Sequence, residues 1–350
     1  MVLVNTVSTP VEPVPLWIDC DVGHDDALAI MLAAYNPHIK LLGISTVSGN
    51  TSVKNCTKNA IQVLKAAGIE GVKVYEGAAK PLVKKVFHAS EYHGPNGLIG
   101  AKYLPKADYA KYFDGSCSAV NAMYNAITSS PVPISIAAIG PLTNIALLLG
   151  MYPDVVAKIK TLLIMGGSIG MGNITPAAEF NIFCDPEAAH AVLNSTLNHV
   201  VMVPLDTTGT VLASKSIVRR IKDTLPDPHF AELITGLFWH YSSEYSDISG
   251  VKDGAPVHDP AALAYIFMSE LFTGKHIRVD VECNAGLCNG RTLCDFYNCT
   301  GQAPNCWVAT SLDIDTFWNH MIDSLTAAAK NCCLDPMNPD NGNADLPSSA

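Results

Sequence analysis

Four carboxylates lie within the eight residues DCDVGHDD, which run from Asp19 to Asp26. An apolar segment precedes this stretch and another follows it, so these side chains cannot all spread into water. Closely spaced carboxylates repel one another unless something neutralises them. Hard divalent cations prefer such oxygen ligands. The stretch therefore predicts a metal site, whereas a single aspartate here would be explained as a helix cap.

Other motifs for metal, dinucleotide or phosphate binding fit this sequence less well. An EF-hand would need an acidic residue or Asn at the position of Gly23 and Glu at that of Ile30. The glycine-rich segment from Met165 to Gly172 lacks the G-x-G-x-x-G spacing of a dinucleotide site, and no Walker A sequence is present. The initial D-x-D also occurs in phosphatases that use an aspartyl nucleophile, which we keep as the alternative function.

The elements that must position these carboxylates alternate between strands and helices. Apolar runs predict strands over residues 15–20, 39–47, 72–75, 134–139, 161–165 and 200–205. Helices are predicted over residues 25–35, 53–67, 118–127, 142–149, 186–193, 230–245, 260–268 and 315–328, with a few later strands. The strands are continuously apolar, as in a sheet covered on both faces. We therefore predict an α/β fold with a mostly parallel central sheet flanked by helices.

Three further polar clusters fall at strand ends or helix starts. They are STVSGN, which ends at Asn50, the segment that carries Asn173, Glu179 and Asn181, and VHDPAA around Asp259. Each cluster alone is explained by a turn or a helix cap. Together they place amides and carboxylates at the edge of the sheet where α/β proteins bind ligands. Such groups suit a polyhydroxylated ligand because they bond hydroxyls as donors or acceptors.

Length and composition favour one large domain. The chain has 350 residues, 49% of them hydrophobic, without an obvious linker or internal repeat. We expect an N-terminal extension over residues 1–14, a single domain over residues 15–330, and a disordered tail over residues 331–350. The net charge of −10 without a basic block argues against a nucleic-acid partner. Membrane-length apolar runs and a signal peptide are not apparent, so we expect a cytoplasmic protein with no membrane partner.

Cysteines and glycosylation sequons bear on the same question of location. Five of the eleven cysteines lie between Cys283 and Cys306, in spacings unlike those of a zinc ribbon. The odd, scattered set favours mostly free, buried thiols in a reducing compartment. A disulfide or two between Cys283 and Cys306 is the alternative. Sequons begin at Asn50 and Asn173, both candidate site residues, and we expect no glycan at either.

These motifs together resemble the inosine-uridine-type nucleoside hydrolases. The D-x-D-x-G-x-D-D-A pattern of Asp19 to Ala27 is that family's signature. The likeness continues in order through GISTVSGN, HGPNGL, GPLTNIA, MGGSIGMGN, AEFNIFCDPEAA and VHDP. It implies a Rossmann-like nucleoside hydrolase fold and a homodimer or homotetramer. It also implies hydrolysis of uridine, inosine and related ribonucleosides to free base and ribose, in nucleoside salvage.

The resemblance assigns the metal and the chemistry to particular residues. Asp21, Asp26 and Asp259 would bind Ca²⁺ through their carboxylates, and Ile139 through its backbone carbonyl. Asp25 would be the general base that takes a proton from the attacking water. The glycosidic bond would break through an oxocarbenium-like state. Three carboxylates around one dication leave a charge of about −1, which favours such a cationic state.

The resemblance also implies how the ribose is held. Asn181 would bond the ring hydroxyls, and Asn50 would lie near the ribose. Asn173 and Glu179 would hold the 5′-hydroxyl. Asp19 would support the calcium ligands from behind.

The leaving base is expected to meet two histidines. His258 matches a residue associated with base binding or protonation, and His93 matches one near the nucleobase, which together favour uridine and inosine. Tyr241 and Tyr245 lie one helical turn apart in a segment that can wall the base pocket, and a core or interface role is equally expected for each. A calcium-dependent sugar-binding protein without turnover is a second alternative, against which the intact Asp25 argues.

Overall fold

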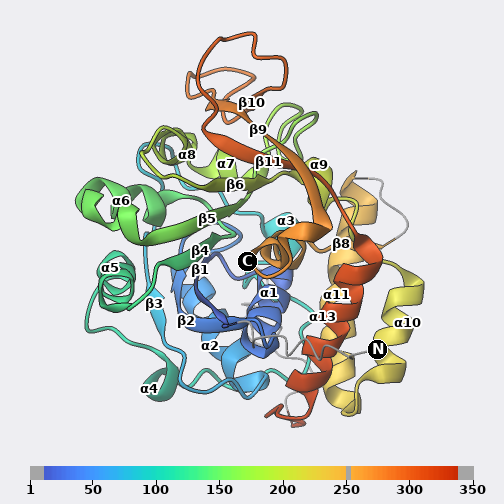
Figure 1. Cartoon of the computed structure of the whole chain (residues 1–350). Helices are drawn as coiled ribbons and strands as arrows, with labels where there is room; N and C mark the ends of the chain where they lie inside the picture. Colours follow the sequence, from blue (N-terminus) through green and yellow to red (C-terminus); the bar gives the residue numbers. More distant parts are fainter. Residues whose placement is uncertain (1–11, 250–253, 338–350) are drawn as a thin grey trace, which may run out of the picture.

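The structure is a computed structural model that describes residues 12–249 and 254–337. A nine-stranded sheet runs through it in the order β10-β9-β11-β6-β5-β4-β1-β2-β3 (Figure 1). Its strands are β1 (Val14–Cys20), β2 (Ile39–Thr46), β3 (Val74–Glu76), β4 (Ile134–Ala138), β5 (Ile159–Met165), β6 (Val200–Val203), β9 (Phe272–Val281), β10 (Thr292–Asp295) and β11 (Cys306–Leu312). Neighbours from β3 to β11 pair in parallel, and only β9 pairs antiparallel, with β10 and β11. The predicted α/β fold with a mostly parallel sheet is confirmed.

Helices cover both faces of this sheet (Figure 1). They are α1 (His24–Tyr35), α2 (Val53–Ala66), α3 (Ser90–His93), α4 (Tyr109–Tyr112), α5 (Ala119–Ser129), α6 (Thr143–Met151), α7 (Phe180–Cys184), α8 (Pro186–Leu193), α9 (Leu205–Thr208), α10 (Lys215–Thr224), α11 (Pro228–Ser249), α12 (His258–Leu263) and α13 (Ile314–Ala329). The short strands β7 (Leu212–Ala213) and β8 (Ala255–Pro256) form a separate antiparallel pair. The two largest hydrophobic clusters lie under α1, α2, α11, α12 and α13 and under α5, α6 and α8.

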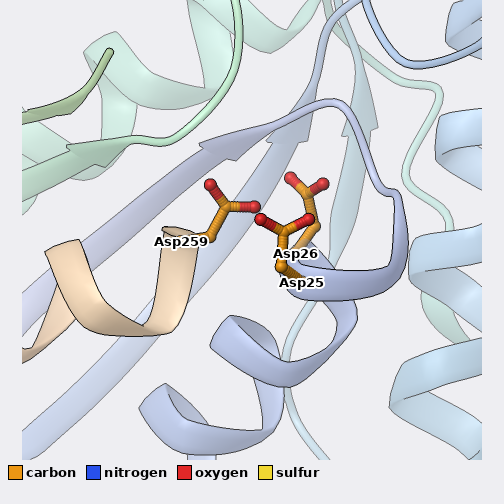
Figure 2. A group of neighbouring side chains, drawn as sticks. All are labelled: Asp25, Asp26 and Asp259. Atoms are coloured by element: carbon orange, nitrogen blue, oxygen red, sulfur yellow. The ribbon is translucent and has the colours of Figure 1, made fainter. Parts of the chain in front are cut away.

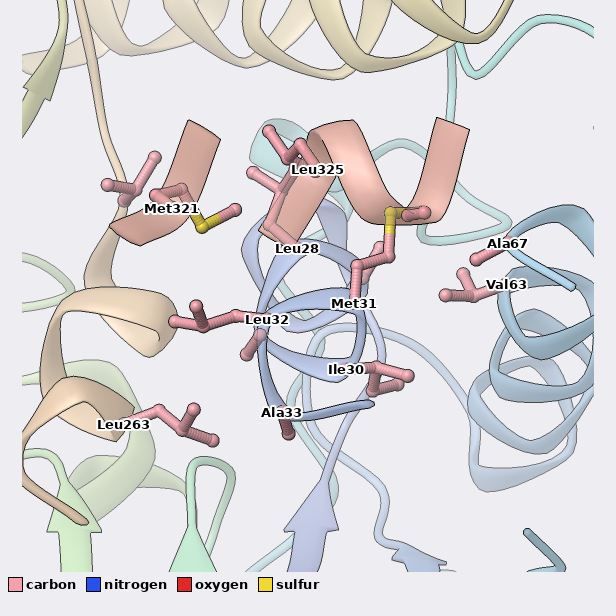
Figure 3. Close-up of a cluster of buried hydrophobic side chains, with 14 of the residues drawn as sticks. Leu28, Ile30, Met31, Leu32, Ala33, Val63, Ala67, Leu263, Met321 and Leu325 are labelled. Carbon is pink, nitrogen blue, oxygen red and sulfur yellow. The ribbon is translucent and has the colours of Figure 1, made fainter. Parts of the chain in front are cut away.

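Helix α1 is buried on nearly every side, which fixes the acidic stretch at its start. Figure 3 shows its apolar side chains between α2, α12 and α13, with Leu28 and Met31 near Leu325 of α13 and Leu32 facing Leu263 of α12. A helix that is apolar all round must be enclosed by other elements. Its first turn therefore has little freedom to move toward water.

The order of the strands reverses beside β1, and this reversal creates the ligand-binding edge. The chain passes from β1 outward to β2 and β3, then returns to add β4 on the other side of β1. Open α/β sheets bind ligands at the carboxyl ends of strands where such a switch occurs. Asp21 follows β1 and Ile139 follows β4, and the Ile139 N–H donates to the Asp19 carbonyl at 2.9 Å. Both predicted metal ligands thus lie at the switch.

Some predicted boundaries differ from those observed. The helix predicted over residues 260–268 begins at His258 and ends at Leu263, after which the chain tightens into a 3₁₀ turn. The one-turn helix α3 (Ser90–His93) lies where no helix was predicted. Residues 331–337, placed at the start of the predicted tail, still bond to the body, because the Cys333 N–H donates to the Ala66 carbonyl at 2.9 Å. Residues 1–11 and 338–350 lie outside the described residues.

Two remaining expectations concern cysteines and membranes. All eleven cysteines fall in the described ranges and are free thiols, as expected, but only Cys20, Cys56, Cys184 and Cys306 are buried. The expectation of mostly buried thiols was wrong. The cysteine-rich stretch, Cys283 to Cys306, lies at the outer edge of the sheet, where loops meet solvent. Within the described ranges, no helix has the length and apolar character needed to span a bilayer.

Candidate active site

The first turn of α1 folds back on the loop that precedes it. One carboxylate oxygen of Asp26 accepts the Gly23 N–H at 2.7 Å, and the other accepts the Asp21 N–H at 3.2 Å. Acidic groups at this end of a helix are favoured by its dipole. Asp26 therefore holds the turn that brings Asp21 and Asp25 to the same side of the sheet edge.

The Asp21 carboxylate is enclosed by backbone. It accepts the Asn50 N–H at 2.7 Å, and the Asn50 side-chain amide donates to Asp26 at 3.2 Å. A side chain at Gly49 or Gly140 would overlap the Asp21 carboxylate, so both positions need glycine. The loops after β2 and β4 thereby fix the direction of this carboxylate.

A third element brings in Asp259. Figure 2 shows Asp25 and Asp26 at the start of α1 and Asp259 at the start of α12, with their carboxylates close together. Oxygens of these three buried groups lie within 4.8 Å of one another, in an arrangement that could hold a metal ion. Asp21 is not part of this tightest group but lines the same cavity as Asp25 and Asp259. One aspartate, Asp21, thus comes from the carboxyl end of β1, and the other three come from the first turns of α1 and α12.

Burial and mutual repulsion disfavour charge on these carboxylates. Desolvation, together with the neighbouring carboxylates, raises the pKa of Asp26 to about 7 and raises those of Asp21 and Asp259 well above their usual range. Desolvation raises the pKa of Asp25 to about 6. Groups in this situation either bind protons or bind a cation. The site is therefore electrostatically suited to a divalent ion.

The segment after β5 supplies an amide and carboxylate wall. Glu179 caps α7, and its carboxylate accepts the N–H groups of Asn181 at 2.9 Å, Ile182 at 3.1 Å and Gly167 at 2.9 Å. The Asn181 side-chain amide donates to the carbonyls of Ile139 at 3.2 Å and Met165 at 3.1 Å. The carbonyl oxygen predicted to bind metal is thus tied to a predicted ribose ligand.

The remaining predicted polar residues meet at this wall. Asn173 accepts the Phe180 N–H at 2.9 Å through its side-chain oxygen. One cavity is lined by ten of the predicted site residues: Asp21, Asp25, Asn50, His93, Ile139, Asn173, Glu179, Asn181, His258 and Asp259. Asp26 is fully buried and is not among the lining residues, but its carboxylate accepts from the Asn50 amide. Residues that were far apart in the sequence are thus brought together as the strand-end argument expects.

Each of the two histidines has a buried partner. His258 lies 2.8 Å from the Thr208 hydroxyl through Nδ1, and burial lowers its pKa to about 4, so the ring is uncharged at neutral pH. His93 lies 3.0 Å from His24, Nδ1 to Nδ1, and the two rings stack with centroids 5.2 Å apart. The His24 Nε2 faces the Ile99 carbonyl at 2.9 Å and must donate to it. The loop that carries His93 is thereby joined to α1.

Asp19 lies beneath the cluster. It is fully buried, one of its oxygens accepts from Ser45 and from the Asn144 amide at 2.8 Å, and the other has no hydrogen-bond partner. Desolvation raises its pKa to about 7. Asp19 lies in β1, two residues before Asp21, and is not among the residues that line the cavity. Its support of the calcium ligands stays a prediction.

Several cavity residues did not emerge from the sequence. Tyr92, Ile174 and Phe180 line the cavity, and His24 and Thr208 bond the two histidines. Tyr92 and Phe180 are direct neighbours of predicted residues, and this adjacency was the only signal for them. Tyr241 and Tyr245 lie on α11, but their side chains are outside the described part of the structure.

Comparisons with known proteins agree with this fold. The family described as inosine-uridine preferring nucleoside hydrolase matches residues 16–319. An inosine-uridine preferring nucleoside hydrolase of Leishmania major is 40% identical over 321 residues, covering 89% of this chain and 98% of that protein. A pyrimidine-specific ribonucleoside hydrolase of Salmonella arizonae is 36% identical over 311 residues, covering 89% and 98%. The solved structure of a purine-preferring ribonucleoside hydrolase from Gardnerella vaginalis has a TM-score of 0.81 at 28% identity, covering 90% and 99%.

The family match and the named relatives place the chain in the class of hydrolases that act on N-glycosyl compounds. The chain belongs to the inosine-uridine preferring nucleoside hydrolase family. Its reaction is accordingly the cleavage of the N-glycosidic bond of ribonucleosides. The names of its relatives cover inosine-uridine, pyrimidine and purine preferences, so membership alone does not select the base.

Proposed function

We propose that this protein is a calcium-dependent hydrolase of uridine, inosine and related ribonucleosides. The observation that carries the proposal is the single cavity on which buried aspartates, amides and a glutamate converge. Carboxylates at one end suit a cation, and the amide and carboxylate wall suits hydroxyl groups. A ribose with its hydroxyls matches that combination.

Asp21, Asp26 and Asp259 would hold the ion together with the carbonyl of Ile139. All four donors are oxygens, the ligand type of Ca²⁺ rather than of softer metals. Burial and neighbouring carboxylates raise the pKa values of the three aspartates, and a cation would relieve that repulsion. When bound, Ca²⁺ would lower the pKa of a water and orient two ribose hydroxyls.

The ribose would lie against the wall formed by the segment after β5. Asn181 uses its N–H groups on two backbone carbonyls, so its side-chain oxygen is the atom left to accept a ring hydroxyl. Glu179 already accepts three N–H groups, and its carboxylate has capacity for about one further donor. That donor would be the 5′-hydroxyl, with Asn173 as its second partner and Asn50 near the ring.

Asp25 would take the proton of the attacking water. It lines the cavity, and burial raises its pKa above that of an exposed aspartate, which makes its carboxylate a better proton acceptor. The bond to the base would break as positive charge develops on the ribose. The excess of carboxylates around the cavity stabilises that charge.

His93 and His258 would meet the leaving base, with Tyr241 and Tyr245 as candidate walls. His258 is uncharged at neutral pH and bonded to Thr208, so we expect it to act as a hydrogen-bond partner of the base rather than as a cation. Two imidazoles offer donors and acceptors to the polar edges of uracil and hypoxanthine. This supports uridine and inosine as the preferred substrates.

A nucleoside panel tests the proposal. Ribose release from uridine and inosine is measured as reducing sugar, with a chelator and with added Ca²⁺, and a generic phosphoester serves as the comparison. We expect release that the chelator abolishes and Ca²⁺ restores. Uridine binding without release would indicate a sugar-binding protein, and phosphate release alone would indicate the aspartyl phosphatase.

We further infer a cytoplasmic homodimer or homotetramer that acts in nucleoside salvage. Asn50 and Asn173 begin glycosylation sequons, but both line the cavity and Asn50 is only 7% exposed. A glycan there would occupy the place of the substrate. We expect mass spectrometry of natively produced protein to find neither modified, and a glycan on Asn50 of active enzyme would contradict this.

A further inference from the structure

The cysteine-rich stretch after β9 has no place in the function described so far. It forms the β9–β10 hairpin and the loop to β11 at the outer end of the sheet, which project from the body (Figure 1). The inner side of this stretch packs closely against α7 and α8. Gly290 lies against the backbone of Phe183, and the Cys283 thiol lies 3.4 Å from the Pro186 carbonyl. The stretch therefore adjoins α7, which carries Asn181 of the wall after β5, and α8, which follows α7.

One residue of β10 makes two reciprocal bonds to the glycine-rich loop after β5. The Thr292 hydroxyl donates to the Ser168 carbonyl at 2.6 Å and accepts the Ser168 N–H at 2.9 Å. Thr292 is 2% exposed, so water cannot replace either bond without a rearrangement. Both backbone groups of Ser168 thus depend on one buried hydroxyl.

Ser168 is next to a residue that bonds Glu179. The Gly167 N–H donates to the Glu179 carboxylate at 2.9 Å, and the Gly167 carbonyl accepts the Leu205 N–H at 2.9 Å. Gly167 has a φ of 73°, and a side chain there would press on Thr292. Thr292 therefore fixes the peptide group beside the donor that orients Glu179.

The far end of the same loop is held separately. Asp206 accepts the N–H groups of Ile169 at 2.6 Å and Gly170 at 2.9 Å. Loss of the Thr292 bonds would consequently loosen the Gly167–Ser168 part while the Ile169–Gly170 part stays anchored. The disturbance is expected to reach Glu179 and not the aspartates at β1.

We propose that Thr292 is a positioning residue that sets recognition of the substrate's 5′-hydroxyl by orienting Glu179. The cysteine-rich stretch, which contains Thr292, is then part of the ribose site. This inference rests on the proposed function, in which Glu179 and Asn173 hold that hydroxyl. It predicts that the hairpin contributes to selectivity for ribosides with an intact 5′-hydroxyl.

The test compares Thr292→Val with Thr292→Ser on uridine and on 5′-deoxyuridine. Valine has the shape of threonine without the hydroxyl, and serine keeps the hydroxyl. We expect kcat/KM of Thr292→Val for uridine to fall about tenfold, since small displacements of positioning groups have effects of that order or larger. For 5′-deoxyuridine it should stay within about twofold of wild type. Thr292→Ser should resemble wild type on both substrates.

Equal losses on both substrates would overturn the inference and make Thr292 a structural residue. If valine prevents folding, Thr292→Cys, which keeps a weak donor, replaces it, and the loss must again be confined to uridine. Wild-type enzyme that hydrolyses both substrates equally well would refute the 5′-hydroxyl subsite and this inference with it. Wild-type enzyme that hydrolyses neither would instead refute the proposed function.

Discussion

Replacement of Asp25 by Asn separates metal binding from chemistry in the acidic cluster. Asn has nearly the same shape and can still accept a hydrogen bond, but it cannot take a proton at neutral pH. Loss of a general base costs about 10²–10⁴ in rate, equivalent to about 3–5 kcal/mol in the activation barrier. We expect a fall of that size in kcat for uridine, while the affinity for a non-hydrolysable nucleoside analogue changes by about tenfold or less.

The geometry of the cluster gives a second, independent readout. Oxygens of Asp25, Asp26 and Asp259 lie within 4.8 Å of one another. Two unit charges at that separation repel by roughly 3.5 kcal/mol at an effective dielectric constant of about 20. Asp25→Asn removes one of these charges. At pH 8, the metal-free Asp25→Asn variant should therefore have a higher melting temperature than the metal-free wild-type protein.

Calcium binding decides between the two roles open to Asp25. Its carboxylate belongs to the tightest group of oxygens, whereas Asp21, assigned as a ligand, lies beside that group. Calorimetric titration of Asp25→Asn should show one Ca²⁺ bound, and Asp21→Asn, the matched control, should lose it. Near-normal kcat would remove Asp25 from the mechanism. Loss of both Ca²⁺ and kcat would make Asp25 a ligand and refute our division of roles.

Three further predictions follow from the site. Asp259→Ala should lose bound Ca²⁺ and activity but keep its circular dichroism spectrum; a tightly bound Ca²⁺ would reduce Asp259 to a helix cap. The melting temperature of the metal-free protein should be higher at pH 5 than at pH 7.5, because the raised pKa values of Asp25 (about 6) and Asp26 (about 7) mean that folding takes up protons in this range. Bound Ca²⁺ should weaken this pH dependence. A melting temperature that rises with pH in the metal-free protein would contradict the prediction. His258→Ala should reduce kcat/KM for inosine and uridine unequally, because the bases accept protons at different atoms; an equal, small effect would leave His258 a structural neighbour of Asp259.

Local features of the sequence predicted the sheet and its functional edge. Each apolar run identifies a strand, and the residues just after it identify the groups at the end of that strand, because a strand and its exit loop are contiguous in the chain. Asp21, Asn50 and Ile139 follow three such strands. The parallel arrangement then requires these ends to meet at one edge. The helix predicted at Pro260 was misplaced at its end, since helix ends depend on packing as well as propensity.

Partners distant in the sequence could not be predicted in this way. His24 and His93 are 69 positions apart, Thr208 and His258 are 50 apart, and Thr292 is 124 positions from its partner in the loop after β5. None of these pairs follows a local period of helix or strand. The cysteine-rich stretch offered no interpretable motif, because its cysteines do not make its contact with the loop after β5. That contact joins the Thr292 hydroxyl to the backbone of Ser168.

The sequence by itself determined the chemistry available, namely carboxylates and amides at the ends of buried strands, because residue types and their place along a strand are local properties. Only the tertiary structure decided which groups share a cavity and which of their oxygens are already bonded. The Asp21 carboxylate takes its direction from Gly49 and Gly140, and Glu179 takes its direction from a loop held by β10. Those directions come from close packing between segments that meet only when the chain is folded.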